Sequence, residues 1–132
     1  HLFFSHHPPP PPLLSGLVGS EMCIRDRNLI TDSKKKGRPI LAVGTTSTRT
    51  LESQAFKQPI QKTRSGSTNC FIIPGWHFKN VDHLLTNFHL PKSTLYLLVS
   101  AFCGKTLAKK AYSEAISQKY RFFSYGDAML IR

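Results

Sequence analysis

Between residues 28 and 132 the chain alternates between short continuous apolar runs and longer stretches in which apolar residues recur with a helical period. Three runs are apolar at nearly every position: Pro39–Val43, Cys70–Ile73 and Ala128–Ile131. A short apolar run without alternation is typical of a strand buried on both faces, as in a parallel sheet. We therefore predict a strand at each of these runs.

Two helices are predicted between the second and third of these strands. Ser93–Cys103 is apolar almost all round, which indicates a buried helix. In Thr106–Gln118, apolar residues repeat every four positions at Ala108, Tyr112 and Ile116, which indicates an amphipathic helix. Strands alternating with helices predict an α/β fold, a layered domain with a buried, largely parallel sheet.

A glycine turn follows the first predicted strand. Gly44 permits a tight turn, and the hydroxyl residues after it can cap a helix that starts there. The free N–H groups of such a helix start bind anions, and ligands of open α/β sheets lie at this end of the strands. Arg49, one turn into the helix, is placed to reach a carboxylate or phosphate. The candidate substrate-binding residues here are Thr45, Thr46, Ser47 and Arg49. The alternative is a simply capped helix.

A polar turn interrupts the apolar stretch from Leu84 to Ser93. Asn and His followed by Pro are unusual inside a strand, since Pro91 removes a backbone donor and pushes Leu90 toward an extended conformation. We predict a short buried strand, a polar turn, and a helix that begins near Ser93. Side chains on such a turn are held by a rigid scaffold, where binding and catalytic groups are often found. The candidates are Asn87, His89, Lys92 and Ser93.

Two roles are open for His89. In extended chain, Phe88 and Leu90 would be buried on one face, and His89 would lie on the same side as Asn87. A neutral imidazole in that position can accept a proton from a substrate. Alternatively, Asn87 and His89 only satisfy buried backbone groups, since buried polar groups are nearly always paired.

The last candidate is Asp127, which follows the predicted turn Ser124–Gly126. A carboxylate beside a glycine turn most often bonds to the turn's own backbone. It can also be a carboxylate placed at the site, so Asp127 and His89 are both candidate proton acceptors.

The chain has 132 residues, enough for one domain, and 18 Lys and Arg against 7 Asp and Glu, a net charge of +11. This excess favours an acidic partner such as RNA. Apolar runs fall well short of the ~20 residues that span a membrane. Cys23, Cys70 and Cys103 form no CxxC pair and are odd in number, so neither a zinc site nor a disulfide framework is expected, and a reduced cytosolic setting fits.

The first 27 residues differ in composition from the rest. They include five consecutive prolines, Pro8–Pro12, and the string LVGSEMCIRD at residues 17–26 resembles a translated sequencing-library adapter. We predict that residues 1–27 are non-native and disordered, and that the folded part of the chain is residues 28–132. The alternative is a polyproline II ligand segment. Charges within residues 1–27 cancel, so the positive charge belongs to residues 28–132.

Three segments closely resemble the S-adenosylmethionine:tRNA ribosyltransferase-isomerase family of the queuosine pathway. They are GTTSTRTLES at 44–53, FIIPGWHFKNVDHLLTNFHLPKSTLYLLVSAFCG at 71–104 and YRFFSYGDAMLI at 120–131. Two departures stand out: Thr48 replaces a usual aliphatic residue, and Trp76-His77 replaces a commoner aromatic–basic pair. The resemblance implies that residues 28–132 are the C-terminal part of an α/β catalytic domain, which in the family accompanies a smaller β domain.

The resemblance also implies an activity. Family members transfer and isomerise the ribosyl part of S-adenosylmethionine onto 7-aminomethyl-7-deazaguanine at the tRNA wobble position, which gives epoxyqueuosine and releases adenine and methionine. It implies a cytoplasmic, monomeric enzyme that needs no metal and no membrane. The family chemistry begins with loss of a proton next to the sulfonium, for which His89 or Asp127 would be the base. The 132-residue chain is expected to be inactive by itself.

Two other functions fit parts of the sequence. A basic RNA-binding α/β module without catalysis would explain the charge, although the polar turn favours an enzyme. An ordinary nucleotide-binding α/β enzyme would use the Gly44 turn, but neither GxGxxG nor GxxxxGK[ST] is present.

Overall fold

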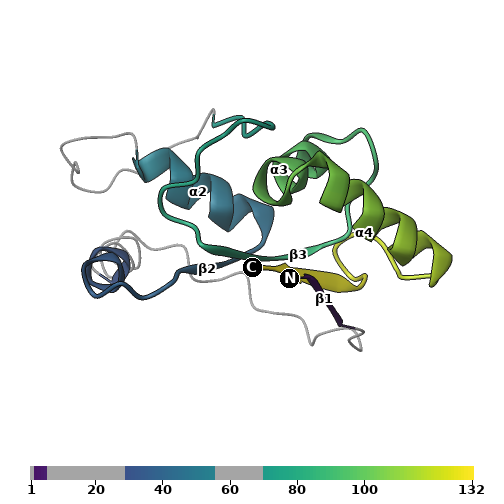
Figure 1. Ribbon diagram of the computed structural model, residues 1–132, viewed down its shortest axis with the longest axis horizontal. Coiled ribbons are helices and arrows are strands. Elements are labelled where there is room, and N and C mark those ends of the chain that lie inside the picture. Colours follow the sequence, from purple (N-terminus) through teal and green to yellow (C-terminus); the bar gives the residue numbers. More distant parts are fainter. Residues whose placement is uncertain (1, 6–28, 56–69) are drawn as a thin grey trace.

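The computed structural model describes residues 2–5, 29–55 and 70–132 (Figure 1). Residues 29–35 are helical. The elements then follow in the order β1 (Leu2–Ser5), β2 (Leu41–Val43), α2 (Thr45–Ala55), β3 (His83–Asn87), α3 (Thr94–Cys103), α4 (Lys105–Ser117) and β4 (Ala128–Ile131). This confirms the predicted α/β fold class.

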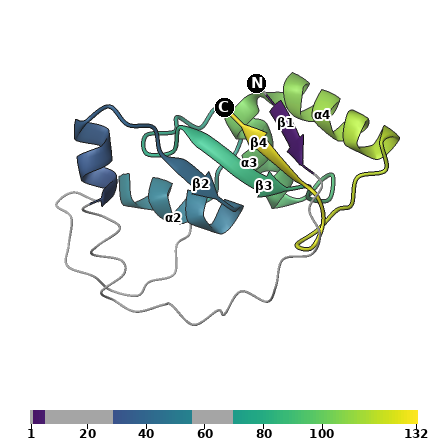
Figure 2. The same ribbon diagram turned by 90° about the horizontal axis from the view of Figure 1, so that it is seen from below.

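The four strands form one sheet in the order β1-β4-β3-β2. β2 and β3 are parallel, whereas β4 is antiparallel to both β3 and β1. The sheet is therefore mixed, whereas the sequence predicted a largely parallel sheet. The chain leaves α4 and enters β4 through a turn, and β4 then runs in the direction opposite to β3. Helices α2, α3 and α4 lie on one side of the sheet (Figure 1), and the strands are seen from below in Figure 2.

Three of the predicted strands are confirmed, at β2, at β4 and, before the polar turn, at β3. The strand predicted at residues 70–73 is wrong: these residues are not in a strand, although Ile72 is buried. The carbonyl of Cys70 accepts a hydrogen bond from the Arg49 side chain instead of from a neighbouring strand. β2 is also less buried than expected, since Leu41 and Val43 are about half exposed at this edge of the sheet.

Both predicted helices are confirmed. Ser93 caps α3, where its hydroxyl accepts a hydrogen bond from the N–H of Tyr96 at 3.1 Å. Gly104 separates α3 from α4 with φ 85°, a conformation that favours glycine. The buried side of α4 is formed by Ala108, Ala111, Tyr112 and Ala115. Ile116 is 60% exposed, contrary to the four-residue repeat, because eight residues turn a helix about 80° past the position of Ala108.

The core lies between the sheet and α3 and α4. Phe88 directly follows β3 and is fully buried. The centroid of its ring lies 5.3 Å from that of Tyr112, 5.8 Å from that of Tyr120 and 5.5 Å from that of Phe122. Leu84 and Leu98 complete this apolar centre. The core therefore holds the chain immediately before His89 in a fixed place.

Strand β1 lies within the segment predicted to be foreign. Its four residues pair with β4, with Leu2 opposite Ile131 and Ser5 opposite Ala128. The open edge of a sheet can pair with an added strand through backbone hydrogen bonds. Such pairing depends little on which side chains the added strand carries. Residues 1 and 6–28 lie outside the described residues, and the foreign origin of residues 1–27 stays a prediction.

Candidate functional site

The functional candidates gather at one edge of the sheet. Because β2 and β3 are parallel, their carboxyl ends lie together, and α2 starts directly after β2. Antiparallel pairing places Ala128, the first residue of β4, opposite Asn87, the last residue of β3. We call this the carboxyl edge, formed by Gly44, Asn87–Ser93 and the turn 121–127. Ligands of α/β sheets bind at such an edge.

The Gly44 turn has the predicted form. Gly44 adopts φ 87°, and its N–H donates to the carbonyl of Leu85 on β3 at 2.8 Å. Thr48, the departure from the family pattern, is buried and donates its hydroxyl to the Gly44 carbonyl at 2.9 Å. Thr45 is buried, whereas Thr46 and Ser47 are exposed in the first turn of α2. These two hydroxyls and the helix start therefore face solvent at the carboxyl edge.

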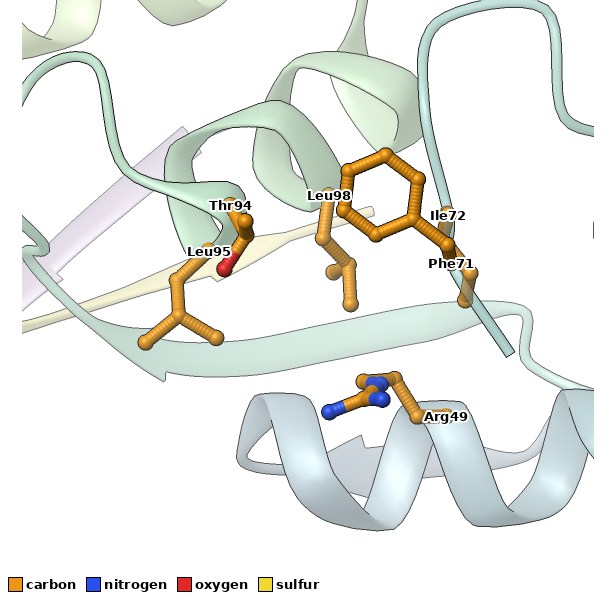
Figure 3. Close-up of a pocket in the computed structure, with 6 residues that line it drawn as sticks. All are labelled: Arg49, Phe71, Ile72, Thr94, Leu95 and Leu98. Carbon is orange, nitrogen blue, oxygen red and sulfur yellow. The ribbon is translucent and has the colours of Figure 1, made fainter. Parts of the chain in front are cut away.

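Arg49 lies on the wall of a pocket between α2 and α3. Its Nε donates to the Cys70 carbonyl at 2.9 Å, which ties α2 to the following segment. The pocket has a volume of about 230 Å³ and is lined by Arg49, Phe71, Ile72, Thr94, Leu95 and Leu98 (Figure 3). Arg49 was a candidate from the sequence, whereas the other five residues were not, since Leu95 and Leu98 look like ordinary core positions of an apolar helix.

His89 is half-buried and turns back toward the helices. Its Nε2 lies 3.0 Å from the hydroxyl of Thr86, and its backbone N–H donates to the Tyr112 hydroxyl at 3.1 Å. Burial lowers the pKa of His89 below its usual value and raises that of Tyr112 to about 12. The imidazole is therefore neutral at pH 7, as a proton acceptor requires.

Part of the predicted geometry around His89 is wrong. Leu90 is 53% exposed rather than buried, and the His89 ring bonds to Thr86 rather than sharing a side with Asn87. β3 ends at Asn87, so the alternation of an extended strand stops there. Asn87 instead donates its Nδ2 to the carbonyl of Gly126 at 3.2 Å and ties β3 to the turn 121–127.

Asp127 is enclosed by its own turn. The Asp127 side chain is 1% exposed. Its Oδ2 accepts a hydrogen bond from the backbone N–H of Arg121 at 2.7 Å, and its Oδ1 lies 3.3 Å from Nη2 of Arg121. A Cβ at Gly126 would lie 2.4 Å from the Arg121 carbonyl, so only glycine fits there. These contacts match the turn-stabilising alternative, and a catalytic role for Asp127 stays a prediction.

Lys92 and Ser93 occupy the connection to α3. Lys92 is exposed and adopts φ 65°, the left-handed region, which reverses the chain after Pro91. The Ser93 hydroxyl donates to the Leu90 carbonyl at 2.7 Å and accepts from the Tyr96 N–H. The cap thus engages Ser93 locally, while the Lys92 side chain extends into solvent at the carboxyl edge.

A buried carboxylate that sequence reasoning missed anchors α2. Glu52 is fully buried and accepts four N–H groups: Oε1 from Asn80 and Val81, Oε2 from Lys79 and the Trp76 indole. The lone acidic residue in GTTSTRTLES was its only signal. Glu52 fixes the chain that leads from the pocket to β3.

Metal binding and membrane insertion are two further properties on which the described residues bear. Within residues 2–5, 29–55 and 70–132, no three His, Cys, Asp or Glu side chains are grouped to hold a metal ion. The expectation that no metal takes part stays a prediction. Among the helices of the described part, none has the length and apolar character to cross a membrane.

Comparison with known proteins points to one family. Residues 21–131 match the family described as queuosine biosynthesis protein, a match that begins inside the segment predicted to be foreign. The S-adenosylmethionine:tRNA ribosyltransferase-isomerase of Halothermothrix orenii is 58% identical over 104 residues, which are 79% of this chain and 30% of the relative. The protein of the same name from Polynucleobacter asymbioticus is 62% identical over 102 residues, 77% of this chain and 28% of the relative.

A solved structure agrees with the sequence matches. The crystal structure of S-adenosylmethionine tRNA ribosyltransferase from Thermotoga maritima superposes with a TM-score of 0.75 at 49% identity, covering 87% of this chain and 39% of the other. The chain therefore spans about 30% of the length of the curated relatives that it matches.

Proposed function

The chain belongs to the queuosine biosynthesis protein family, and from this premise we propose that it takes part in tRNA modification as a section of an S-adenosylmethionine:tRNA ribosyltransferase-isomerase. The enzyme would move the ribosyl moiety of S-adenosylmethionine onto 7-aminomethyl-7-deazaguanine at the wobble position and form epoxyqueuosine in the cytoplasm. The observation that carries the proposal is the 58% identity to a relative of that name over 79% of this chain.

His89 is the base in this proposal. Thr86 donates its hydroxyl to the Asn87 carbonyl at 3.4 Å, so the tautomer that completes the chain of hydrogen bonds has Nε2–H donating to Thr86. Nδ1 then carries the lone pair and takes the proton next to the sulfonium. The lowered pKa keeps that lone pair available at neutral pH. Asp127 shapes the adjoining turn through Arg121 rather than accepting the proton.

The neighbouring candidates bind the substrates in this proposal. Thr46 and Ser47, with the first N–H groups of α2, take polar groups of the donor, and Thr45 contributes through its backbone because it is buried. Arg49 takes the donor's carboxylate. Asn87 and Ser93 hold the walls of the site in place. Lys92 contacts an RNA phosphate from its exposed position.

An exposed aromatic turn supports RNA as the second substrate. Phe123 is 59% exposed and Tyr125 is 77% exposed, and both lie in the turn 121–127 at the carboxyl edge. The N–H of Phe123 donates to the carbonyl of Phe88, the residue before His89, at 2.9 Å. Exposed aromatics beside cations stack on unpaired bases, as in an anticodon loop. The net charge of +11 supplies attraction to phosphates.

A chimera tests the proposal. The matched section of the Halothermothrix orenii relative is replaced by the corresponding residues of this chain, and adenine release from S-adenosylmethionine is measured with precursor tRNA. We expect the chimera to release adenine and the 132-residue chain alone to release none. A folded chimera that binds tRNA but releases no adenine would instead support the RNA-binding module without catalysis.

In the same chimera, His89→Ala and His89→Gln should each lower turnover by about 10²-fold or more, the scale of general-base catalysis. Thermal stability and tRNA affinity should stay nearly unchanged. His77→Ala is the matched control, because His77 is exposed and lies outside the carboxyl edge. Near-normal turnover of the Gln variant, or loss of activity through unfolding, would show that His89 is only a structural hydrogen-bonding residue.

A further inference from the structure

The pocket between α2 and α3 has a composition that the proposed catalytic residues do not explain. Of the six described residues that line it, four are apolar: Phe71, Ile72, Leu95 and Leu98. Thr94 and Leu95 belong to the first turn of α3, which begins at the carboxyl edge, and Leu98 follows one turn later. Figure 3 shows the side chains of Thr94, Leu95 and Leu98 extending from α3 toward β3, with Arg49 of α2 on the other side of β3 in this view. A small apolar cavity with two polar groups is typical of a ligand subsite.

The charge of the lining is one-sided. Arg49 is its cation and Thr94 contributes a hydroxyl, and among the residues that the structure describes no acidic side chain lines the pocket. The nearest carboxylate along α2, Glu52, is already engaged by four N–H donors. The bond from Nε to the Cys70 carbonyl fixes the plane of the guanidinium, and its five N–H donors allow it to take a carboxylate as well. The pocket therefore suits a ligand with an anionic end.

The size of the pocket between α2 and α3 restricts the ligand further. At about 230 Å³ the pocket is smaller than the ~300–1,000 Å³ of sites that enclose a whole drug-sized ligand. It has room for one end of S-adenosylmethionine. Only the amino-acid end combines a carboxylate, an apolar chain of methylenes and a cationic sulfur, whereas the adenosine end carries no charge.

We propose, on the basis of the function proposed above, that this pocket binds the amino-acid end of S-adenosylmethionine. The carboxylate lies on Arg49, and the methylenes pack against Leu95 and Leu98. The sulfonium lies against the ring of Phe71, which attracts cations through its π face. The Thr94 hydroxyl accepts a hydrogen bond from the ammonium group. Phe71 and Arg49 are thus specificity determinants for a sulfonium donor.

The 132-residue chain tests this by calorimetric titration with S-adenosylmethionine, S-adenosylhomocysteine, methionine and adenosine. Arg49→Met keeps the side-chain stem and removes the charge. It should weaken binding of S-adenosylmethionine by about 10-fold or more and leave adenosine binding unchanged. Phe71→Ala should weaken binding of S-adenosylmethionine by about 5-fold and abolish its preference over S-adenosylhomocysteine, whose sulfur carries no charge. Phe71 is 54% exposed, so this truncation leaves the core intact.

Ile73→Ala and Arg38→Met are the matched controls, because both residues are exposed and neither lines the pocket. Both should leave every affinity unchanged. Competition by adenosine but not by methionine, unchanged affinity in Arg49→Met and Phe71→Ala, or no binding at millimolar S-adenosylmethionine would each overturn the pocket assignment. An active chimera with any of these results would refute only the pocket, whereas normal binding in an inactive chimera would refute only the catalytic function.

Discussion

The two sides of the helical layer are held together by different physical means. Under α4, Phe88 packs in a cluster of aromatic rings from Tyr112, Tyr120 and Phe122. Beside α2, the fully buried Glu52 collects four N–H groups from the chain between Trp76 and Val81. Apolar packing has no required direction, whereas a carboxylate requires donors at defined positions. The aromatic side should therefore tolerate conservative substitutions better than the Glu52 side.

Glu52→Gln is expected to have the largest effect on stability. In either orientation of the new side-chain amide, its NH₂ group stands where a carboxylate oxygen of Glu52 accepts two N–H groups. Those two N–H donors then face a donor instead of an acceptor. We expect the free energy of unfolding to fall by about 3 kcal/mol, the scale of lost hydrogen bonds to a buried charged group. Urea denaturation of the 132-residue chain measures it. Glu114→Gln on the exposed face of α4 is the control and should cost less than about 0.5 kcal/mol. If Glu52→Gln and Glu114→Gln lowered the free energy of unfolding equally, the buried hydrogen bonds of Glu52 would not distinguish this side of the helical layer from the aromatic side.

Phe88→Leu tests the aromatic side of the same comparison. Leucine keeps the site apolar and nearly filled, and the surrounding rings can shift without losing a hydrogen bond. We expect a loss of about 1–1.5 kcal/mol, as for other moderate changes of shape in a core. The same urea measurement applies, with Phe123→Leu as the exposed aromatic control. A loss larger than that of Glu52→Gln would mean that the aromatic side is the less tolerant of the two.

The smallest expected effect concerns His89, which lies where the aromatic core meets the carboxyl edge. Burial lowers its pKa in the folded chain, so below the unfolded value of about 6.5 the unfolded chain binds a proton that the folded chain does not. Stability should therefore fall as the pH falls from 7.5 to 5.5. His89→Gln should reduce that loss, measured as the difference in Tm between the two pH values. The other histidines are common to both chains, and an identical pH dependence would contradict a lowered pKa for His89.

Several features of this protein were determined by the sequence alone, because they depend on neighbours only a few residues apart. The apolar runs located β2 and β4, and the apolar segment after Ser93 located α3 together with its cap. The same local signals placed the Gly44 turn and the polar turn at the ends of successive strands. Three distinctive segments were enough to indicate the family.

Only the tertiary structure decided how the site is assembled, because its contacts join residues far apart in the chain. Glu52 meets its donors 24–29 residues later, and the Cys70 carbonyl turns to Arg49 instead of to a strand. The direction of β4 and the hydrogen bond from the His89 backbone N–H to the Tyr112 hydroxyl, 23 residues later, likewise depend on long-range packing. The pocket exists only because α2 and α3 lie side by side over parallel strands. Periodicity records which face of an element is apolar, but the partner of that face is set by burial and hydrogen-bond satisfaction across the whole fold.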